Sequence, residues 1–334
     1  MSRNTLALLD RLPGAAVLAA GDVMLDRYVY GEAVRLSPEA PVPVVAVRRK
    51  TWAPGGLGNV VMNLHALGAR ALAAGVVGAD AKAEALRGLL SGALSEGSPG
   101  FIADPERPTT VKTRVIAGIQ QVVRFDEEST REVPPPVVAA YTGAVAKAFP
   151  LARALTVSDY GKGLLTPGVL AFLLGGARAA GIPSIVDPKG ADWERYRGAT
   201  LVTPNRAELA LAYGRDVSRA TGEILAEAGR ELMRRHGIEN LLVTRSEDGM
   251  TLLLSSGETV HLPTRARAVF DVSGAGDTVV AAVAASLAAG AGLREGAALA
   301  SLAAGVVVGK VGTATASPEE IRESAAISEL AARR

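Results

Sequence analysis

Short apolar runs alternate with longer stretches of helical character along much of the chain. Runs with the length of buried strands lie at 15–20, 71–77, 154–157, 184–186, 200–202 and 240–244. Helices are predicted over 60–67, 82–90, 166–180, 207–213 and 279–289. Strands that alternate with helices are typical of an α/β fold in which a mainly parallel sheet is covered on both faces. Ligands of such folds bind beyond the carboxyl ends of the strands.

Two β-rich pieces, at about 23–51 and 109–127, interrupt this alternation. The first contains a predicted strand over 42–47, and the second contains β-rich runs at 110–116 and 121–125 around Ala117-Gly118, which predicts a hairpin. We interpret both pieces as a small β-sheet lid inserted into one domain that spans residues 1–334.

The amino-acid composition excludes several classes of function. The 334 residues are 49% hydrophobic, and 36 Lys and Arg stand against 34 Asp and Glu, so net charge gives no argument for a nucleic-acid or membrane partner. The absence of cysteine excludes disulfides, thiol catalysis and cysteine-ligated zinc. Residues 1–12 lack a secretory apolar core, and no apolar stretch is a convincing membrane span. We therefore expect a cytoplasmic protein.

The most informative segment is the glycine turn Asp271-Val272-Ser273-Gly274-Ala275-Gly276-Asp277-Thr278, which precedes a small-residue apolar run. Glycine lets the backbone approach an anion, and the N–H groups and dipole of a first helical turn favour a phosphate there. Asp277 is then placed to accept the proton of an attacking hydroxyl. The alternative interpretation is a tight loop before a buried helix with an acidic N-cap.

A second polar segment, Asn205-Arg206-Ala207-Glu208, follows directly on a predicted strand. Asn205 and Glu208 have the spacing of a helix capping box, which is the structural interpretation. They also have the oxygen ligands of a Mg²⁺ site that nucleotide phosphates and waters would complete. The sequence leaves both interpretations open.

A third segment, Gly55 to Asn59, is predicted to be a loop before an amphipathic helix. Its functional interpretation uses Gly55 and Gly56 for close backbone approach and Asn59 for hydrogen bonds to a polyol, a task that Asp26 can share. Cations scattered through the lid and after strand ends would suit a substrate that carries a phosphate, although each alone is typical of a solvated surface. They are Arg35, Lys112, Arg114, Arg124, Lys162 and Lys189.

Motifs for other chemistries are missing or incomplete. Gly305 to Val311 superficially resembles a Walker A loop but is one residue short and lacks the Ser or Thr after the lysine. No Gly-x-Gly-x-x-Gly follows the first strand, which weakens a dinucleotide interpretation. His65, His236 and His261 are far apart without ligand spacing, so no zinc site is expected.

The glycine turn 271–277 and the early Gly55-Gly56 with Asn59 resemble the two signatures of the ribokinase-like (PfkB) carbohydrate kinases, and the resemblance covers nearly the whole chain. It implies a three-layer sandwich with a mainly parallel central sheet and an inserted β lid. It also implies transfer of a phosphoryl group from ATP, with Asp277 as the base and the amides of Gly274, Ala275 and Gly276 stabilising charge on the transferred group.

The same resemblance implies roles for further residues. Asn205 and Glu208 would organise Mg²⁺, and Asp271 with Ser273 would help form a K⁺ site. The residues implied to line the nucleotide pocket are Thr244, Ser246, Gly249, Gly274, Gly276 and Gly305, together with Asn205 and Glu208. Asp26, Gly55, Gly56 and Asn59 would bind the sugar, and the candidates near phosphates are Arg124, Lys162 and Lys189. A homodimer formed through the lid is also implied, since pairing covers open sheet edges.

Several stretches resemble one subfamily, the kinases that phosphorylate the C1 hydroxyl of D-glycero-β-D-manno-heptose 7-phosphate on the route to ADP-heptose and lipopolysaccharide. These stretches are 21–28, 37–44, 187–190, 193–200, 242–250 and 305–318. Two features depart from the subfamily pattern: Ser273 stands where Thr is frequent, and Leu57-Gly58 replaces a pair of small residues. The nucleotidyltransferase half of bifunctional relatives is not found in the 334 residues, which implies a stand-alone kinase and a separate nucleotidyltransferase downstream.

Three alternatives remain at the level of sequence. A kinase for another sugar or for a nucleoside would use the same residues. A non-catalytic regulator would bind sugar or nucleotide without turnover, against which the intact Asp277 argues. A dinucleotide oxidoreductase is disfavoured because its glycine fingerprint is missing.

Overall fold

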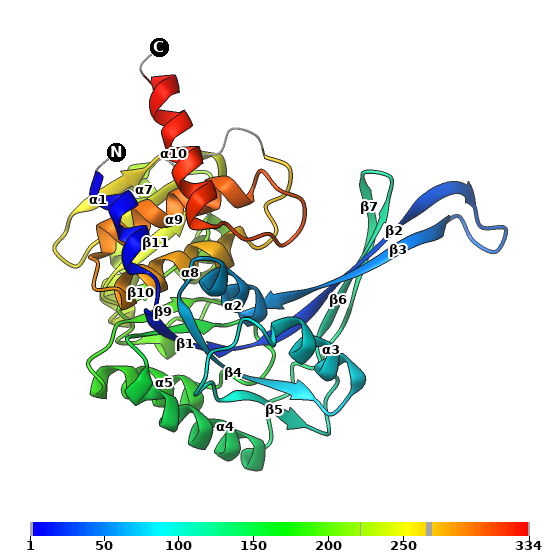
Figure 1. Cartoon of the computed structure of the whole chain (residues 1–334), viewed down its shortest axis with the longest axis horizontal. Helices are drawn as coiled ribbons and strands as arrows, with labels where there is room; N and C mark the ends of the chain where they lie inside the picture. Colours follow the sequence, from blue (N-terminus) through cyan, green and yellow to red (C-terminus); the bar gives the residue numbers. More distant parts are fainter. Residues whose placement is uncertain (1–2, 221, 265–268, 333–334) are drawn as a thin grey trace.

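The computed structural model describes residues 3–220, 222–264 and 269–332 and is built around one large sheet (Figure 1). Its nine strands have the spatial order β13-β12-β11-β10-β9-β8-β1-β4-β5. Neighbouring strands pair parallel, except at one edge, where β12 pairs antiparallel with both β11 and β13. The strands are β1 (Ala16–Gly21), β4 (Arg70–Gly78), β5 (Gly100–Asp104), β8 (Ala154–Ser158), β9 (Ser184–Asp187), β10 (Leu201–Val202), β11 (Leu241–Thr244), β12 (Met250–Leu253) and β13 (Thr259–Leu262).

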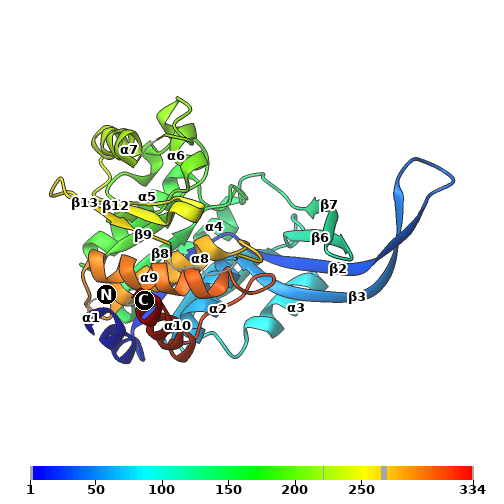
Figure 2. The ribbon, with the colours of Figure 1, turned by 90° about the horizontal axis from the view of Figure 1, so that it is seen from above.

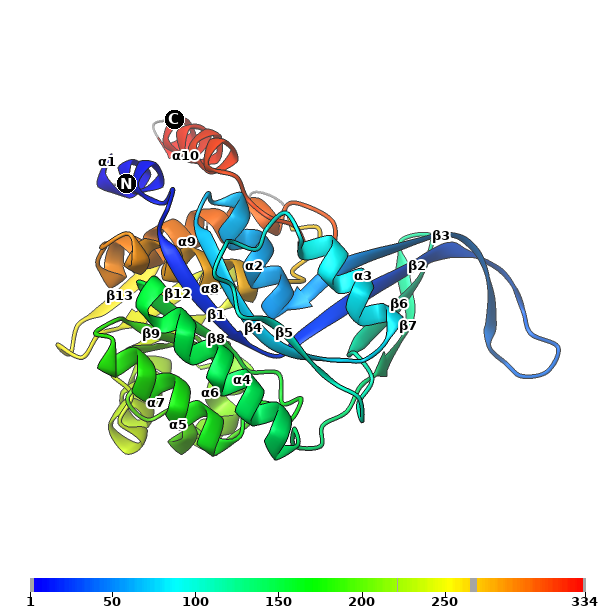
Figure 3. The same cartoon turned by 60° about the horizontal axis from the view of Figure 1, so that its bottom comes forward.

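Helices cover both faces of this sheet because its strands are apolar on both sides. In β1, Val17 and Ala19 belong to one core cluster, whereas Leu18 and Ala20 belong to the other. The first cluster is covered by α1 (Arg3–Ala7), α2 (Leu57–Ala66), α3 (Ala81–Leu90), α8 (Ala275–Ala288), α9 (Leu293–Val307) and α10 (Pro318–Ala332). The second is covered by α4 (Pro135–Ala148), α5 (Pro167–Ala179), α6 (Arg206–Tyr213) and α7 (Gly222–His236). Figure 3 shows α4 and α5 on the face opposite α8 and α9.

A second, four-stranded sheet projects from one end of the molecule as a long arm (Figures 1 and 2). Its order is β3-β2-β6-β7, with β2 (Val23–Leu36), β3 (Pro43–Gly56), β6 (Val111–Ala117) and β7 (Gln120–Glu127). One residue, Asp22, separates β1 from β2, and β3 passes directly into α2. The lid strands are therefore continuous with the elements that build the centre of the main sheet.

The predicted fold class is confirmed, as are the predicted strands and helices, within a few residues at their ends. The strand predicted over 42–47 is the exception, since β3 extends from Pro43 to Gly56. The four-stranded sheet lies where the lid was expected. The prediction of a loop over Gly55 to Asn59 is wrong: β3 continues to Gly56, and α2 begins at Leu57, so Asn59 lies in its first turn. The chain turns into the helix at Gly56, which has a φ of 56°, and the N–H of Leu57 donates to the distant carbonyl of Asp22 at 3.0 Å.

Other elements were not predicted from the sequence, among them β5, the antiparallel hairpin of β12 and β13, and helices α4, α7, α9 and α10. Four 3-10 turns, at Leu8–Arg11, Phe149–Leu151, Glu194–Tyr196 and Ser246–Asp248, complete the structure. Among the described residues, no helix has the length and apolar character needed to cross a membrane.

Candidate active site

Polar side chains gather where the central strands end and α8 begins. Asp22 follows β1, Asp159 and Tyr160 follow β8, and Asp187 is the last residue of β9. Because these strands are parallel neighbours, their carboxyl ends share one edge of the sheet. Asp277, in the first turn of α8, lies against this edge through its contact with Tyr160. The predicted residue Asp277 thus meets the polar residues at the ends of the central strands along this edge.

The carboxylate of Asp277 is buried and held by two donors. The Nδ2 of Asn59 donates to its Oδ2 at 2.8 Å, and the hydroxyl of Tyr160 donates to its Oδ1 at 2.7 Å. Burial, with only 6% of the residue exposed, raises the pKa of Asp277 to about 6 although both hydrogen bonds lower it. A carboxylate with this proton affinity accepts a proton more readily than a solvated one and stays ionised at neutral pH.

The glycine turn brings Asn59 and Asp277 together across 218 residues of sequence. Gly274 caps α8 with a left-handed φ of 78°, and a Cβ at this position would lie 2.4 Å from the Nδ2 of Asn59. Asn59 is fixed from below, since Asn63 donates to its side-chain oxygen at 3.2 Å and Thr278 donates to Asn63 at 2.9 Å. Glycine is therefore required here by both conformation and space.

The root of the lid, by which we mean the part of β2 and β6 around Asp26 and Lys112, faces the same carboxylate. Asp26 is 5% exposed and accepts a hydrogen bond of 2.5 Å from Arg114, and a Cβ at Gly55 would lie 2.5 Å from its Oδ2. The Nζ of Lys112 lies 5.4 Å from the centre of the Tyr160 ring and forms no ion pair with any residue that the structure describes. Burial and the nearby Lys162 lower the pKa of Lys112, although the charges of Asp26 and Asp126 partly oppose this shift.

Asn205 and Glu208 form the capping box that their spacing predicts: Asn205 Oδ1 accepts from the Glu208 N–H at 2.9 Å, and Glu208 Oε2 accepts from the Asn205 N–H at 3.0 Å. Burial raises the pKa of Glu208. The Nζ of Lys189 lies 3.9 Å from Glu208, and Thr244 forms a bridge with Asn205. These four predicted residues are thus neighbours beside the end of β11.

Asp187 interacts electrostatically with both Glu208 and the proposed base Asp277. Burial raises its pKa well above the ordinary value, and the negative charges of Asp277 and Glu208 raise it further. Three carboxylates that disfavour one another's charge are an oxygen-rich environment suited to a divalent cation that keeps several waters. In the described part of the chain, no three Asp, Glu, His or Cys side chains approach closely enough to form a complete metal site by themselves.

Asp271 and Ser273 lie together at the start of the glycine turn. Asp271 Oδ1 accepts from the Ser273 N–H at 2.9 Å, and its Oδ2 accepts from the Gly312 N–H at 3.0 Å. Burial raises the pKa of Asp271, but these hydrogen bonds outweigh it and hold the pKa below the ordinary value. The carboxylate therefore stays ionised and ties the turn to the segment after α9.

The remaining predicted residues lie further from the base or have other partners. Arg124 is on the edge strand β7 and pairs with Asp126 at 3.1 Å, and Lys162 pairs with Glu128 at 2.6 Å. Arg35 is exposed towards the far end of the arm. Ser246 and Gly249 form the 3-10 turn after β11, and Gly305 lies within α9.

Sequence reasoning assigned no role in the site to Tyr160, Asn63, Asp22 or Asp187. The signal that would have found three of them is their position, because each lies at or just after the carboxyl end of a parallel strand. Asn63 gives no such signal, since it is one polar residue on an amphipathic helix.

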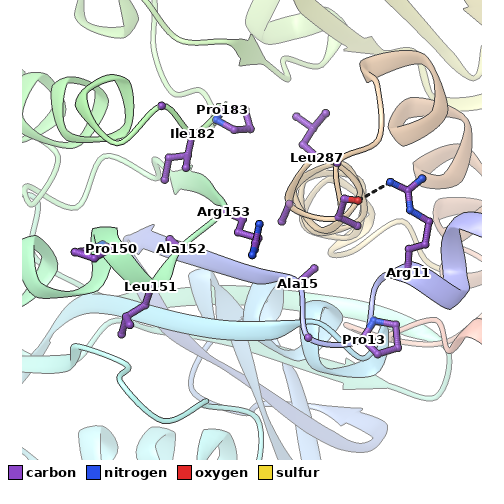
Figure 4. A pocket seen from close by; sticks show the side chains of 15 residues that line it. Arg11, Pro13, Ala15, Pro150, Leu151, Ala152, Arg153, Ile182, Pro183 and Leu287 are labelled. Carbon is purple, nitrogen blue, oxygen red and sulfur yellow. Dashed lines mark hydrogen bonds between the residues drawn. The ribbon is translucent and has the colours of Figure 1, made fainter.

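A separate cavity of about 800 Å³ opens at the amino ends of β1, β8 and β9 (Figure 4). The guanidinium of Arg11 donates to the carbonyl of Ala289 at its rim, at 2.6 Å, and Arg153 also lines it. Because Asp277 lies at the carboxyl ends of these strands, the cavity is at the opposite end of the sheet. None of the predicted site residues lines it.

A parallel sheet with a β lid, and a buried carboxylate behind a glycine turn between them, define a ribokinase-like kinase. A family model described as "pfkB family carbohydrate kinase" matches residues 15–320. The chain belongs to this family and is a carbohydrate kinase.

Curated relatives include the bifunctional protein HldE of Paramagnetospirillum magneticum, 49% identical over 91% of this chain and 62% of the relative. That of Geobacter sulfurreducens is 47% identical over 93% of this chain and 63% of the relative. The chain thus spans under two thirds of these relatives' length.

Solved structures with the same fold include Arabidopsis thaliana ribokinase complexed with ribose and ATP, with a TM-score of 0.72 and 17% identity over 93% of this chain and 98% of that chain. The Escherichia coli phosphofructokinase-2 in complex with potassium has a TM-score of 0.74 and 19% identity over 95% and 99%. At these identities the likeness concerns the fold alone.

Proposed function

We propose that this carbohydrate kinase transfers the γ-phosphoryl group of ATP to the C1 hydroxyl of D-glycero-β-D-manno-heptose 7-phosphate. The products are the 1,7-bisphosphate and ADP. The observation that carries the proposal is the position of Asp277, which is buried, of raised pKa, and set between the glycine turn and the root of the lid. The choice of sugar rests on the subfamily-like stretches of sequence, notably 37–44 and 193–200.

In the proposed reaction, Asp277 takes the proton of the C1 hydroxyl as that oxygen bonds to the γ-phosphorus. The bond from the γ-phosphorus to the bridging oxygen breaks, and ADP leaves. The amides of Gly274, Ala275 and Gly276 lie at the start of α8, where the helix dipole stabilises negative charge on the transferred group. The Ala275 N–H also donates to the carbonyl of Val272 at 3.2 Å. The chain's own contribution is mainly positioning and electrostatics.

ATP would bind along the edge formed by Asn205, Thr244 and the turn at Ser246–Asp248, with Gly249 and Gly305 on its borders. Mg²⁺ fits the chemistry of the corner at Asn205, Glu208 and Asp187, because buried acids of raised pKa are relieved by a cation. When bound, it would neutralise charge on the nucleotide phosphates. We assign Asp271 and Ser273 to a K⁺ site on resemblance alone.

The sugar would lie between Asp26, Gly55, Gly56 and Asn59. Its own phosphate needs a cation without a protein partner, and Lys112 offers one, since it faces Tyr160 and forms no ion pair within the described residues. Arg124, Lys162 and Lys189 remain candidates, although each already forms an ion pair with an acidic residue. We therefore place Lys112 first among the residues proposed to bind the substrate phosphate.

We also propose that two copies of the chain pair through their lids. Both outer strands of the lid, β3 and β7, have open edges, and apolar side chains on the sheet are exposed. They include Val34, Leu36, Val47, Val123 and Phe125. A separate nucleotidyltransferase acting on the product and a cytoplasmic location remain predictions.

The test is to incubate the protein with ATP, Mg²⁺ and heptose 7-phosphate and to identify the product by ³¹P and ¹H NMR. We expect a second phosphate on C1 and stoichiometric ADP. Parallel reactions with fructose 6-phosphate, ribose and a nucleoside measure specificity through coupled ADP release. A higher kcat/KM for one of these would assign another substrate, and saturable sugar binding without ADP would contradict a catalytic role. Asp277→Asn serves as the inactive control.

A further inference from the structure

Three consecutive backbone N–H groups after β8 point at two buried carboxylates. The N–H groups of Tyr160 and Lys162 donate to Asp22 Oδ2 at 2.9 and 3.0 Å, and that of Gly161 donates to Asp159 Oδ1 at 2.9 Å. Asp22 and Asp159 are only 3% and 2% exposed. Because buried carboxylates require such donors, the two acids fix segment 160–162 to the ends of β1 and β8.

The side chain of Tyr160 is directed from this segment onto the proposed base. Its ring packs beside Gly56, where a Cβ would lie 3.3 Å from Tyr160 Cε2 and 2.8 Å from the carbonyl of Asp22. Glycine at 56 therefore leaves the room that the ring occupies. Burial and the nearby Asp277 raise the pKa of Tyr160 well above 10, so its hydroxyl stays protonated and donates to the carboxylate.

We propose that Tyr160 is a positioning residue for phosphoryl transfer: its hydroxyl and the amide of Asn59, one on each oxygen, hold the Asp277 carboxylate in a single orientation. This role rests on the proposed function of Asp277. Rotation of the carboxyl group would break both hydrogen bonds, at 2.7 and 2.8 Å. Each oxygen keeps a further acceptor position for the hydroxyl of the sugar.

Tyr160 also helps to set the pH at which the base is ionised. The charged and titratable groups that face Asp277 are Asp26 from β2, Lys112 from β6, Asp187 from β9 and Tyr160 itself, and Asn59 of α2 adds a neutral donor. Losing a donor to a carboxylate raises its pKa. From the usual strength of hydrogen bonds to charged groups, Tyr160→Phe should shift the titration upwards by about 1 to 2 pH units.

The first experiment needs no substrate. The ¹³Cγ resonance of Asp277, assigned by its loss in Asp277→Asn, is titrated in wild type and Tyr160→Phe with aspartate-labelled protein. We expect a higher midpoint in Tyr160→Phe. Identical midpoints would overturn the proposal. Tyr213→Phe is the matched control, since it removes a tyrosine hydroxyl that bonds Glu231 on the surface at 3.2 Å.

The second experiment measures ADP release against pH. In Tyr160→Phe we expect kcat to fall by about tenfold or more, the acidic limb of kcat/KM to move to higher pH, and KM for ATP to be unchanged. A profile that superimposes on wild type refutes the role. If Tyr160→Phe does not fold, Asp22→Asn replaces it, because it loosens the backbone of segment 160–162 and should move the limb in the same direction. A wild-type protein that releases no ADP would contradict the proposed function, while the NMR titration still decides on the Tyr160 contact.

Discussion

Replacing Asp277 by Asn should lower turnover strongly, and the stability of the variant relative to wild type should increase as the pH rises. Folding raises the pKa of this carboxyl from 3.8 to about 6, mainly through burial. An acid with a raised folded pKa stabilises the fold only when protonated, so its contribution is lost as pH rises through 6. At pH 8 the ionised carboxylate costs about 3 kcal/mol of folding free energy.

At pH 5 the corresponding cost is only about half as large, because the folded carboxyl is largely protonated there. The free energy of unfolding of Asp277→Asn, relative to wild type, should therefore increase by on the order of 1 kcal/mol from pH 5 to pH 8. Asn has its own constant cost, since its amide group cannot accept from both Asn59 and Tyr160, but this cost cancels in the comparison.

The measurements are urea unfolding at both pH values and coupled ADP release at pH 8. We expect kcat to fall by on the order of 10²-fold or more. Asp10→Asn, on the exposed carboxylate that pairs with Arg322, controls for loss of a surface charge and should keep wild-type turnover. A stability difference that does not change with pH, or near-normal turnover in Asp277→Asn, would refute the assignment of a buried base.

Further predictions follow from the same geometry. Gly274→Ala should lower kcat by about 10²-fold, because its Cβ displaces Asn59; an unchanged kcat would show that the turn tolerates a side chain. Glu208→Gln should raise the Mg²⁺ concentration for half-maximal rate several-fold, measured by metal titration, and an unchanged value would move the metal elsewhere. Lys112→Ala should raise KM for the sugar phosphate by about tenfold or more and leave KM for ATP unchanged; equal effects on both would argue against its role. Phe125→Asp should shift the mass measured by light scattering from dimer to monomer, and a monomeric wild type would remove the lid interface.

The features that could be predicted from sequence depend on local rules. Short apolar runs that end in polar residues predict the central strands. The glycine turn before α8 can be predicted because left-handed backbone conformations favour glycine. The capping box at Asn205 and Glu208 formed as its spacing indicates. The capping box itself explains why these two residues have this spacing. The proposal that they also bind Mg²⁺ must be tested by experiment.

The features that could not be predicted depend on distant parts of the chain. The hydroxyl of Tyr160 meets Asp277 across 117 residues, and nothing near Tyr160 in sequence indicates this partner. Likewise, the sequence does not distinguish Lys162 from Lys112, since both are lysines. Only the fold shows that Lys162 pairs with Glu128, whereas Lys112 forms no ion pair within the described residues. The start of α2 was misplaced because the carbonyl that receives its first N–H belongs to Asp22, on another element.

The continuity between the two sheets would link substrate binding by the arm to the alignment of the proposed base. β1 enters the arm through Asp22, which also receives the backbone of Tyr160, and β3 leaves the arm directly into the helix that carries Asn59. A bending motion of the arm must therefore turn the backbone at both junctions, each next to one donor to Asp277. A sugar analogue too short to contact the arm should consequently react slowly even when bound. It would leave the two junctions unmoved, and these junctions carry the donors that orient the carboxylate of Asp277.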